Sequence, residues 1–450
     1  MPIQSINPAT GEVLRTFTPI SDEALRVRIG QAAEAAATQR ALPLEHRALC
    51  LRKLGSLLDE ESPEHARTIS QETGKPLRAA EAEIARCVDA ARFYAEQASR
   101  LLAPELLQSE NGQSYVQWSP MGVVLAVMPW ESPFWHVLRF AIPALAAGNT
   151  ILLKHAASVP QCALQIEALV RRAGFSRGTL SALLIDSTAV NSVLGDERVA
   201  AVTVTGSEST GRAVAAQAGW LLKKSALHLP GSDPLVVMPS ADLDAAVAAA
   251  VRALATGSQA TRLVIHSGVY NDFLHRLVTA VEALQIGDPL KDGTEVGPLG
   301  TADALNTLAE QVAAAVTSGG RIVTGGTRLV GRGNFFEPTI LSDLPRTAVV
   351  ARDALAGPVA LVFRAKDLTE AIAIANDTPF GRAASVWTKE PGEQQQLIAG
   401  IHVGTVALNA LPTDNARAPI GGTKRSGYGR ELGEAGIREF MVAKTVLIGQ

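Results

Sequence analysis

A turn between an expected strand and an expected helix carries residues that could bind a phosphate. The segment VTVTGSESTGRAVA places Gly206 and Ser207 after a β-branched run and Gly211 at the start of the next helix. Free backbone N–H groups at a helix start suit a pyrophosphate, and glycine lets it approach. The spacing is not G-x-G-x-x-G, and an ordinary turn with an N-cap serine has the same residues. Both interpretations stay open from this segment alone.

Lys154 is a second candidate for binding an anion. It follows the apolar run at 150–153, which is expected to form a buried strand. Open α/β sheets bind ligands beyond the carboxyl ends of their strands, where this lysine would lie. The alternative is a surface lysine whose alkyl chain covers apolar neighbours, and from this residue alone that alternative is favoured.

The loop ATGSQATR at 255–262 lies between an alanine-rich helical pattern and a strand-like run. It contains no thiol, carboxylate or imidazole. Its polar side chains include Ser258, Gln259 and Thr261. From composition alone it is a polar connector.

Alternating helices and strands must position these residues. The pattern is helical from about 21 to 101, and further helices are expected at 134–147, after Ser207 and at 243–254. Strands are expected at 123–127, 150–153, 200–204, 263–266, 321–323, 359–363 and 384–387. This alternation predicts an α/β protein with two doubly wound parallel sheets.

Composition excludes several kinds of partner. The 41 Lys and Arg nearly balance the 44 Asp and Glu, for a net charge of −3. No basic field therefore indicates nucleic acid or a membrane surface. No targeting segment or apolar span is present, which predicts a cytoplasmic location. The three cysteines, Cys50, Cys87 and Cys162, have no metal-ligand spacing and are expected to be small buried residues.

Two segments read as edge strands. QSYVQWSPMG at 113–122 alternates like a hairpin, and KTVLIGQ at 444–450 reads as a last strand. Exposed edges of this kind often pair between subunits, so a homodimer or homotetramer is expected.

The segment MPWESPFWHVLRFAIPALAAGNTILLKHA at 128–157 resembles the aldehyde dehydrogenase superfamily, above all its succinate-semialdehyde dehydrogenase-like members. The same resemblance holds for QETGKPL at 71–77, TGSESTGR at 205–212, GDPL at 287–290, VGPL at 296–299, FFEPTIL at 335–341, NDTPFG at 376–381 and GGTKRSGYGRE at 421–431. It implies an aldehyde dehydrogenase-like fold with two doubly wound α/β domains and a small β oligomerisation element.

The resemblance also implies domain boundaries. A Rossmann-like nucleotide-binding domain is expected at 1–112 and 123–227, and a catalytic-type α/β domain at 228–412. The oligomerisation strands are expected at 113–122 and 435–450, with a return segment at 413–434.

The family's chemistry needs a cysteine nucleophile, an asparagine for the oxyanion and a glutamate that activates water. By the resemblance, Glu131 stands at the asparagine and His228 at the glutamate. Ala260 stands at the cysteine, in a loop about three residues shorter than the family's. None of the three cysteines is an obvious substitute for the nucleophile.

The cofactor residues divide into two groups. Trp130, Lys154, Gly206 and Ser207 match the family's adenosine- and phosphate-binding positions. The family's E-x-F-G-P, which holds the nicotinamide ribose, here reads ALAGP at 354–358. The sequence therefore predicts that no cofactor is needed, with residual NAD(P) binding at the adenine half.

Three functions follow, of which the first is favoured. In the first, the protein has lost NAD(P)-dependent oxidation and is repurposed for non-redox acid/base chemistry on a small carbonyl metabolite, using His228 and Glu131. Ser258, Gln259 and Thr261 are less favoured catalytic candidates, and no metal is expected. The alternatives are a non-catalytic pseudoenzyme for assembly or ligand binding, and an atypical NAD(P)-dependent aldehyde dehydrogenase. Arg382 either attracts a substrate carboxylate or is a surface arginine.

Overall fold

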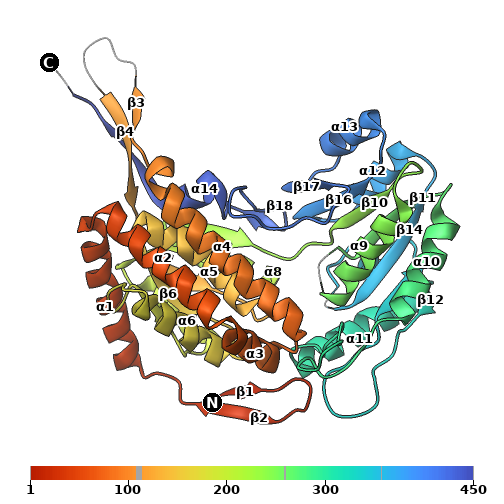
Figure 1. Ribbon diagram of the computed structural model, residues 1–450, viewed down its shortest axis with the longest axis horizontal. Coiled ribbons are helices and arrows are strands. Elements are labelled where there is room, and N and C mark those ends of the chain that lie inside the picture. The colour runs from red at the N-terminus through yellow and green to blue at the C-terminus, as the bar shows by residue number, and fades with distance from the viewer. Residues whose placement is uncertain (1, 108–113, 258–259, 356, 449–450) are drawn as a thin grey trace.

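A computed structural model describes residues 2–107, 114–257, 260–355 and 357–448. The chain forms two sheet-based units that lie side by side, and a three-stranded sheet projects from one of them (Figure 1). Ser258 and Gln259, two of the candidate site residues, lie outside the described residues.

The first unit is built on a six-stranded sheet in the order β19-β9-β8-β5-β6-β7. Its strands are β5 (Val123–Val127), β6 (Thr150–Lys154), β7 (Leu180–Ala182), β8 (Val199–Thr205), β9 (Lys224–His228) and β19 (Gly427–Tyr428). Strands β5 to β9 run parallel, and β19 closes one edge antiparallel to β9.

Helices cover both faces of this sheet because the central strands are apolar on both sides. On β5, Val124 and Ala126 join the core with α2 (Leu44–Glu60), α4 (Leu77–Leu101), α5 (Pro133–Ala147) and α6 (Pro160–Arg172). The alternate residues Val123, Leu125 and Val127 join the core with α1 (Asp22–Ala41), α7 (Val190–Gly195) and α8 (Glu208–Trp220). Helix α3 (Ser62–Thr73) packs on α4. The unit is therefore doubly wound.

The second unit has a seven-stranded sheet in the order β12-β13-β14-β11-β10-β16-β17. The strands are β10 (Pro234–Val237), β11 (Arg262–His266), β12 (Arg321–Thr324), β13 (Thr339–Ser342), β14 (Val359–Ala365), β16 (Ala383–Trp387) and β17 (Thr405–Leu408). All neighbours are parallel except β12 and β13. Helices α9 (Leu243–Ala255) and α10 (Tyr270–Glu282) belong to one core layer, and α11 (Ala302–Thr317), α12 (Leu368–Asn376) and α13 (Pro391–Gly400) to the other.

The projecting sheet joins β3 (Glu105–Leu107), β4 (Ser114–Pro120) and β20 (Met441–Val446), in the order β20-β4-β3. Short pairs are formed by β1 (Ile3–Ile6) with β2 (Val13–Phe17) and by β15 (Phe380–Gly381) with β18 (Thr423–Lys424). Before β20 the chain forms the short helix α14 (Gly433–Arg438). Along the described residues, no helix is long and apolar enough to cross a membrane.

The predicted α/β class with two doubly wound sheets is confirmed. The seven strands expected in the two sheets are present within two residues of their expected bounds, whereas the last strand, expected at 444–450, is β20 at Met441–Val446. Within the two sheets, the sequence pattern predicts no strand at β7, β9, β10, β13, β17 or β19, which have two to five residues each.

Candidate functional site

The turn after β8 has the geometry of an anion site. Gly206 has φ +153°, and a Cβ added there would meet nothing within 4 Å. Ser207 caps α8 by accepting a hydrogen bond from the Thr210 backbone N–H at 3.2 Å. Gly211 packs so closely on Leu229 that a Cβ would lie 2.6 Å from it. The start of α8 is therefore locked in place beside an open face at Gly206, which suits a phosphate.

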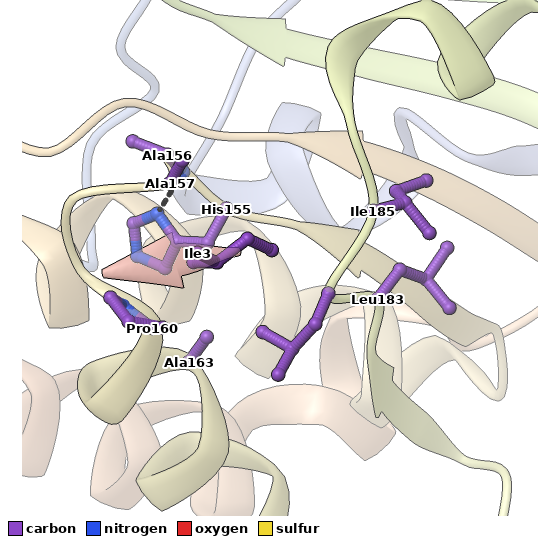
Figure 2. A pocket seen from close by; sticks show the side chains of 9 residues that line it. Ile3, His155, Ala156, Ala157, Pro160, Ala163, Leu183 and Ile185 are labelled. Atoms are coloured by element: carbon purple, nitrogen blue, oxygen red, sulfur yellow. Dashed lines mark hydrogen bonds between the residues drawn. The ribbon is translucent and has the colours of Figure 1, made fainter. Parts of the chain in front are cut away.

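Lys154 ends β6, next to a small pocket beyond the carboxyl ends of β6 and β7 (Figure 2). The lining residues are Ile3, His155, Ala156, Ala157, Pro160, Ala163, Leu183, Leu184 and Ile185. Lys154 is half-buried, and this burial lowers its pKa while Asp186 opposes the shift. A lysine at this edge can bind an anionic ligand group.

His155 fixes the chain next to Lys154. Its Nδ1 accepts a hydrogen bond from the Ala156 N–H at 3.0 Å, and its Nε2 donates to the Pro133 carbonyl at 3.0 Å. Burial lowers the pKa of His155 to about 4, so the ring is neutral near neutral pH. Through Pro133, this histidine also joins the end of β6 to the first turn of α5.

Trp130 lies under a loop of the second unit. A Cβ at Gly300 would lie 2.4 Å from the Trp130 ring, so the two are in direct contact. Leu299 of the same loop approaches Gly357, in the segment that replaces the family's E-x-F-G-P. The described side chains of that segment are apolar, and the Ala354 carbonyl accepts a hydrogen bond from Gln311 Nε2 at 2.9 Å. The phosphate half of the site therefore fits a nucleotide, whereas 354–358 provides no carboxylate for its second ribose.

A buried ion pair shapes the start of α5. Glu83 accepts the backbone N–H groups of Phe134 and Trp135 at 2.8 and 2.9 Å and pairs with Lys75. Lys75 Nζ also donates to Ser132 Oγ at 2.8 Å. Since α5 has no side-chain cap at Ser132, Glu83 takes that role from another helix.

Glu131 stands immediately before this helix start. Its side chain is exposed, and partial desolvation raises the pKa of its carboxyl while Lys75 opposes the shift. The Glu131 carboxylate is therefore easier to protonate than a fully solvated one.

His228 ends β9 and is buried. Its Nε2 lies 3.7 Å from Glu431 Oε1, and Glu431 Oε2 lies 2.5 Å from Arg139 Nε. Burial lowers the pKa of His228, and Glu431 only partly opposes this. His228 is thus a neutral imidazole near neutral pH.

The predicted pairing of Glu131 with His228 has no contact to support it. In the described part of the chain, no hydrogen bond or ion pair joins the two residues, and the charges that shift each pKa do not include the other. Glu131 interacts with Lys75, and His228 with Glu431. That the two side chains face one cavity stays a prediction.

In the loop expected to carry the nucleophile, Thr256 and Gly257 are exposed, whereas Ala260, Thr261 and Arg262 are buried. Ala260 is 7% and Thr261 3% exposed, and the Thr261 carbonyl accepts the Leu361 N–H at 2.7 Å. All three cysteines are buried as predicted, on α2, α4 and α6, and burial raises the pKa of each. None of them is a ready thiolate.

Sequence reasoning missed a cluster of charges on α5 and its neighbours. Asp414 accepts hydrogen bonds from Trp135 Nε1 at 2.7 Å and from Arg139 Nη1 at 3.4 Å. Arg382 pairs with the buried Asp233, so it is neither a free surface arginine nor a free carboxylate receptor. Arg139 and Asp414 are 275 positions apart, and no local spacing could have joined them.

Comparison with known proteins places this geometry in context. The chain matches the aldehyde dehydrogenase family over residues 1–446. A succinate-semialdehyde dehydrogenase [NADP(+)] of Mycobacterium tuberculosis is 44% identical over 456 residues, covering all of both chains. One of Mycobacterium avium is 43% identical, covering all of this chain and 97% of the relative. The crystal structure of succinic semialdehyde dehydrogenase from Streptococcus pyogenes with NADP+ is 31% identical, with TM-score 0.97 and full coverage of both chains.

These relatives correct the favoured functional interpretation. The predicted loss of NAD(P)-dependent oxidation, the non-redox chemistry at Glu131 and His228, and the pseudoenzyme alternative are wrong, because full-length relatives are named as NADP-dependent dehydrogenases. The expectation that no cofactor is needed is wrong for the same reason. Substitutions at three positions therefore do not imply loss of the whole reaction. Of the alternatives, an NAD(P)-dependent aldehyde dehydrogenase is the one that the relatives favour.

Proposed function

Because the chain belongs to the aldehyde dehydrogenase family, we propose that it is an NADP-dependent dehydrogenase of the succinate-semialdehyde type. One observation carries the proposal: identity of 43–44% to such enzymes runs over the whole chain, with all or nearly all of each relative covered. The substrate class is then a short aldehyde that bears a carboxylate.

The residues proposed to hold NADP+ are Trp130, Lys154, Gly206 and Ser207. The open face at Gly206 and the capped start of α8 suit the pyrophosphate, and Lys154 suits an anionic group beyond β6. When bound, NADP+ supplies the hydride acceptor.

We further propose that Glu131, His228 and Ala260 stand where the resemblance puts the family's asparagine, glutamate and cysteine. Ser258, Gln259 and Thr261 remain less favoured candidates. All three cysteines are buried.

The small projecting sheet is proposed to join subunits of a homodimer or homotetramer. Leu106 on β3 is 80% exposed, and Leu447, just after β20, is 78% exposed. Large apolar side chains on sheet edges favour association with a second copy.

The function is tested with the purified full-length protein, NADP+ and succinate semialdehyde. Calorimetric binding of NADP+ and growth of NADPH absorbance are expected, with acid formed in equal amount. Lys154→Met should weaken NADP+ binding about tenfold by loss of a charged contact. An exposed-site control, Lys389→Met, should leave it unchanged. If the unmodified protein neither bound NADP+ nor formed NADPH, the proposal would be overturned.

A further inference from the structure

The N-terminal hairpin of β1 and β2 is held on the first unit. Ser5 on β1 is buried, and its hydroxyl accepts a hydrogen bond at 3.1 Å from Gln161 Nε2, in the first turn of α6. Ile3 on the same strand lines the small pocket next to Lys154, together with His155 (Figure 2). The hairpin therefore forms part of the wall beside one residue of the proposed nucleotide site.

The turn of the same hairpin contacts the second unit. The carbonyl of the buried Pro8 accepts a hydrogen bond from the Asn334 backbone N–H at 2.9 Å. A Cβ added at Gly333 would lie 2.4 Å from the Ala9 carbonyl oxygen. Because backbone meets backbone at this contact, neither segment can shift without disturbing the other. The hairpin thus bridges the two units.

Asn334 connects this contact to Trp130. The Asn334 carbonyl accepts a hydrogen bond from the Leu299 N–H at 2.8 Å. The next residue, Gly300, packs on the Trp130 ring, where an added Cβ would lie 2.4 Å from it. Two successive backbone hydrogen bonds therefore link the N-terminal turn to the loop that covers Trp130.

Asn7 shapes the turn that makes these contacts. Its side-chain Oδ1 accepts a hydrogen bond from the Ala9 N–H at 2.9 Å, and its backbone carbonyl accepts one from the Gly11 N–H at 2.7 Å. An asparagine side chain that binds the backbone two residues ahead fixes a tight turn. Asn7 thereby orients the Pro8 and Ala9 carbonyls that meet the second unit.

We propose that Asn7 is a positioning residue for nucleotide binding, because the turn that it shapes holds the loop at 296–300 against Trp130. This inference rests on the proposed function, which makes Trp130 part of the NADP+ site. Since Ile3 of the same hairpin lines the pocket beside Lys154, the hairpin orders both the cover of Trp130 and the wall next to Lys154. Its effect falls on the affinity for the nucleotide and not on the reaction of the aldehyde.

The test compares Asn7→Ala, which removes the side-chain acceptor, with Asn7→Asp, which keeps an Oδ1 acceptor. Hydrogen exchange is followed by mass spectrometry, without nucleotide, in the peptide that contains Leu299, and NADP+ binding is measured by calorimetry. In Asn7→Ala, this peptide should exchange about three- to tenfold faster and NADP+ should bind about three- to tenfold more weakly, as expected for loss of one net hydrogen bond. Asn7→Asp should stay within about twofold of the unmodified protein. In both variants, kcat at saturating NADP+ and the KM for the aldehyde should change less than about twofold.

A second variant disturbs the same contact from the second unit. Gly333→Ala places its Cβ against the Ala9 carbonyl oxygen and should reproduce both effects of Asn7→Ala. Gly331→Ala is the matched control in the same loop. Gly331 also has a positive φ, +140° against +95° at Gly333, but an added Cβ would meet nothing within 4 Å. This control should change neither the exchange near Leu299 nor the affinity for NADP+.

Several outcomes would overturn the inference. Unchanged exchange near Leu299 or unchanged NADP+ affinity in Asn7→Ala would do so, and so would equal effects of Gly331→Ala and Gly333→Ala. Faster exchange of β5 and β6 to the same degree would also count against it, because that would show general destabilisation. If the unmodified protein bound no NADP+, the proposed function would fail, whereas faster exchange near Leu299 in Asn7→Ala would still support the positioning of this loop by Asn7.

Discussion

Single residues show where reasoning from the sequence succeeds and where it stops. The burial of Cys50, Cys87 and Cys162 could be predicted because a lone cysteine packs as a small apolar side chain. The partner of His228 could not, because β19 lies beside β9 and residue 431, just beyond β19, meets this histidine from far along the chain. Charged partners in a buried cluster depend on that tertiary arrangement, which no local spacing reveals.

The alanine at position 260 and the burial of all three cysteines give a direct prediction. The oxidation by the unmodified protein should be insensitive to iodoacetamide, because all three cysteines are buried with raised pKa values. Ala260→Cys should raise NADPH formation at least about tenfold and make the gained rate sensitive to iodoacetamide. Ala260→Ser is the matched control and should show neither effect. Inhibition of the unmodified protein by iodoacetamide would contradict the prediction.

The buried ring of His155 should make the free energy of unfolding depend on pH. Its pKa is lowered to about 4 in the fold, against about 6.5 in an unfolded chain, so the unfolded state binds more protons between these values. Stability should therefore fall as pH drops below about 6.5, and this residue alone should contribute a loss of about 1.4 kcal/mol by pH 5.5.

The measurement is urea unfolding at pH 7.5 and pH 5.5. His155→Asn should reduce the pH-dependent loss by about that amount, whereas the exposed His275→Gln should not change it. An unchanged pH dependence in His155→Asn would refute the assignment.

At the level of elements, strand and helix patterns could be predicted wherever a run was long and periodic. Helices α5 and α9 and strands β5, β8 and β14 lie close to their expected bounds. Most strands of four residues or fewer were missed, β12 being an exception, because so short a run carries little periodicity. The start of α5 was missed for another reason: its capping carboxylate comes from α4, 51 residues earlier.

Glu83 should therefore control both stability and the proposed site. Glu83→Ala leaves two backbone N–H groups and Lys75 without their partner, and should cost about 3–5 kcal/mol in free energy of unfolding. Glu83→Gln keeps an acceptor and should cost less. Because α5 then starts less firmly, NADPH formation should fall in both variants in the same order. Glu81→Gln, at an exposed position on α4, is the control, and equal stability of all three variants would contradict the role.

For the whole molecule, the resemblance anticipated the class and the two doubly wound sheets, but not how the two units touch. That contact depends on close backbone approach. A Cβ at Gly297 would lie 1.8 Å from the Gly74 carbonyl oxygen, and one at Gly74 would lie 2.5 Å from the Pro298 carbonyl oxygen. Gly74 ends α3 in the first unit, whereas Gly297 belongs to the loop that also covers Trp130 in the proposed nucleotide site. The motifs QETGKPL and VGPL thus meet, although nothing in the sequence pairs them.

Gly297→Ala should separate the two units at this contact. Backbone cannot yield as a flexible side chain would, so the free energy of unfolding should fall by at least about 2 kcal/mol. Since the displaced loop also bears on Trp130, NADP+ should bind several-fold more weakly in the same variant. Gly287→Ala is the matched control, because its added Cβ would meet only Thr294 Oγ1 at 3.7 Å, and both quantities should stay unchanged. If calorimetry showed Gly297→Ala to match the unmodified protein in stability and NADP+ affinity, the two units would not be coupled through this loop.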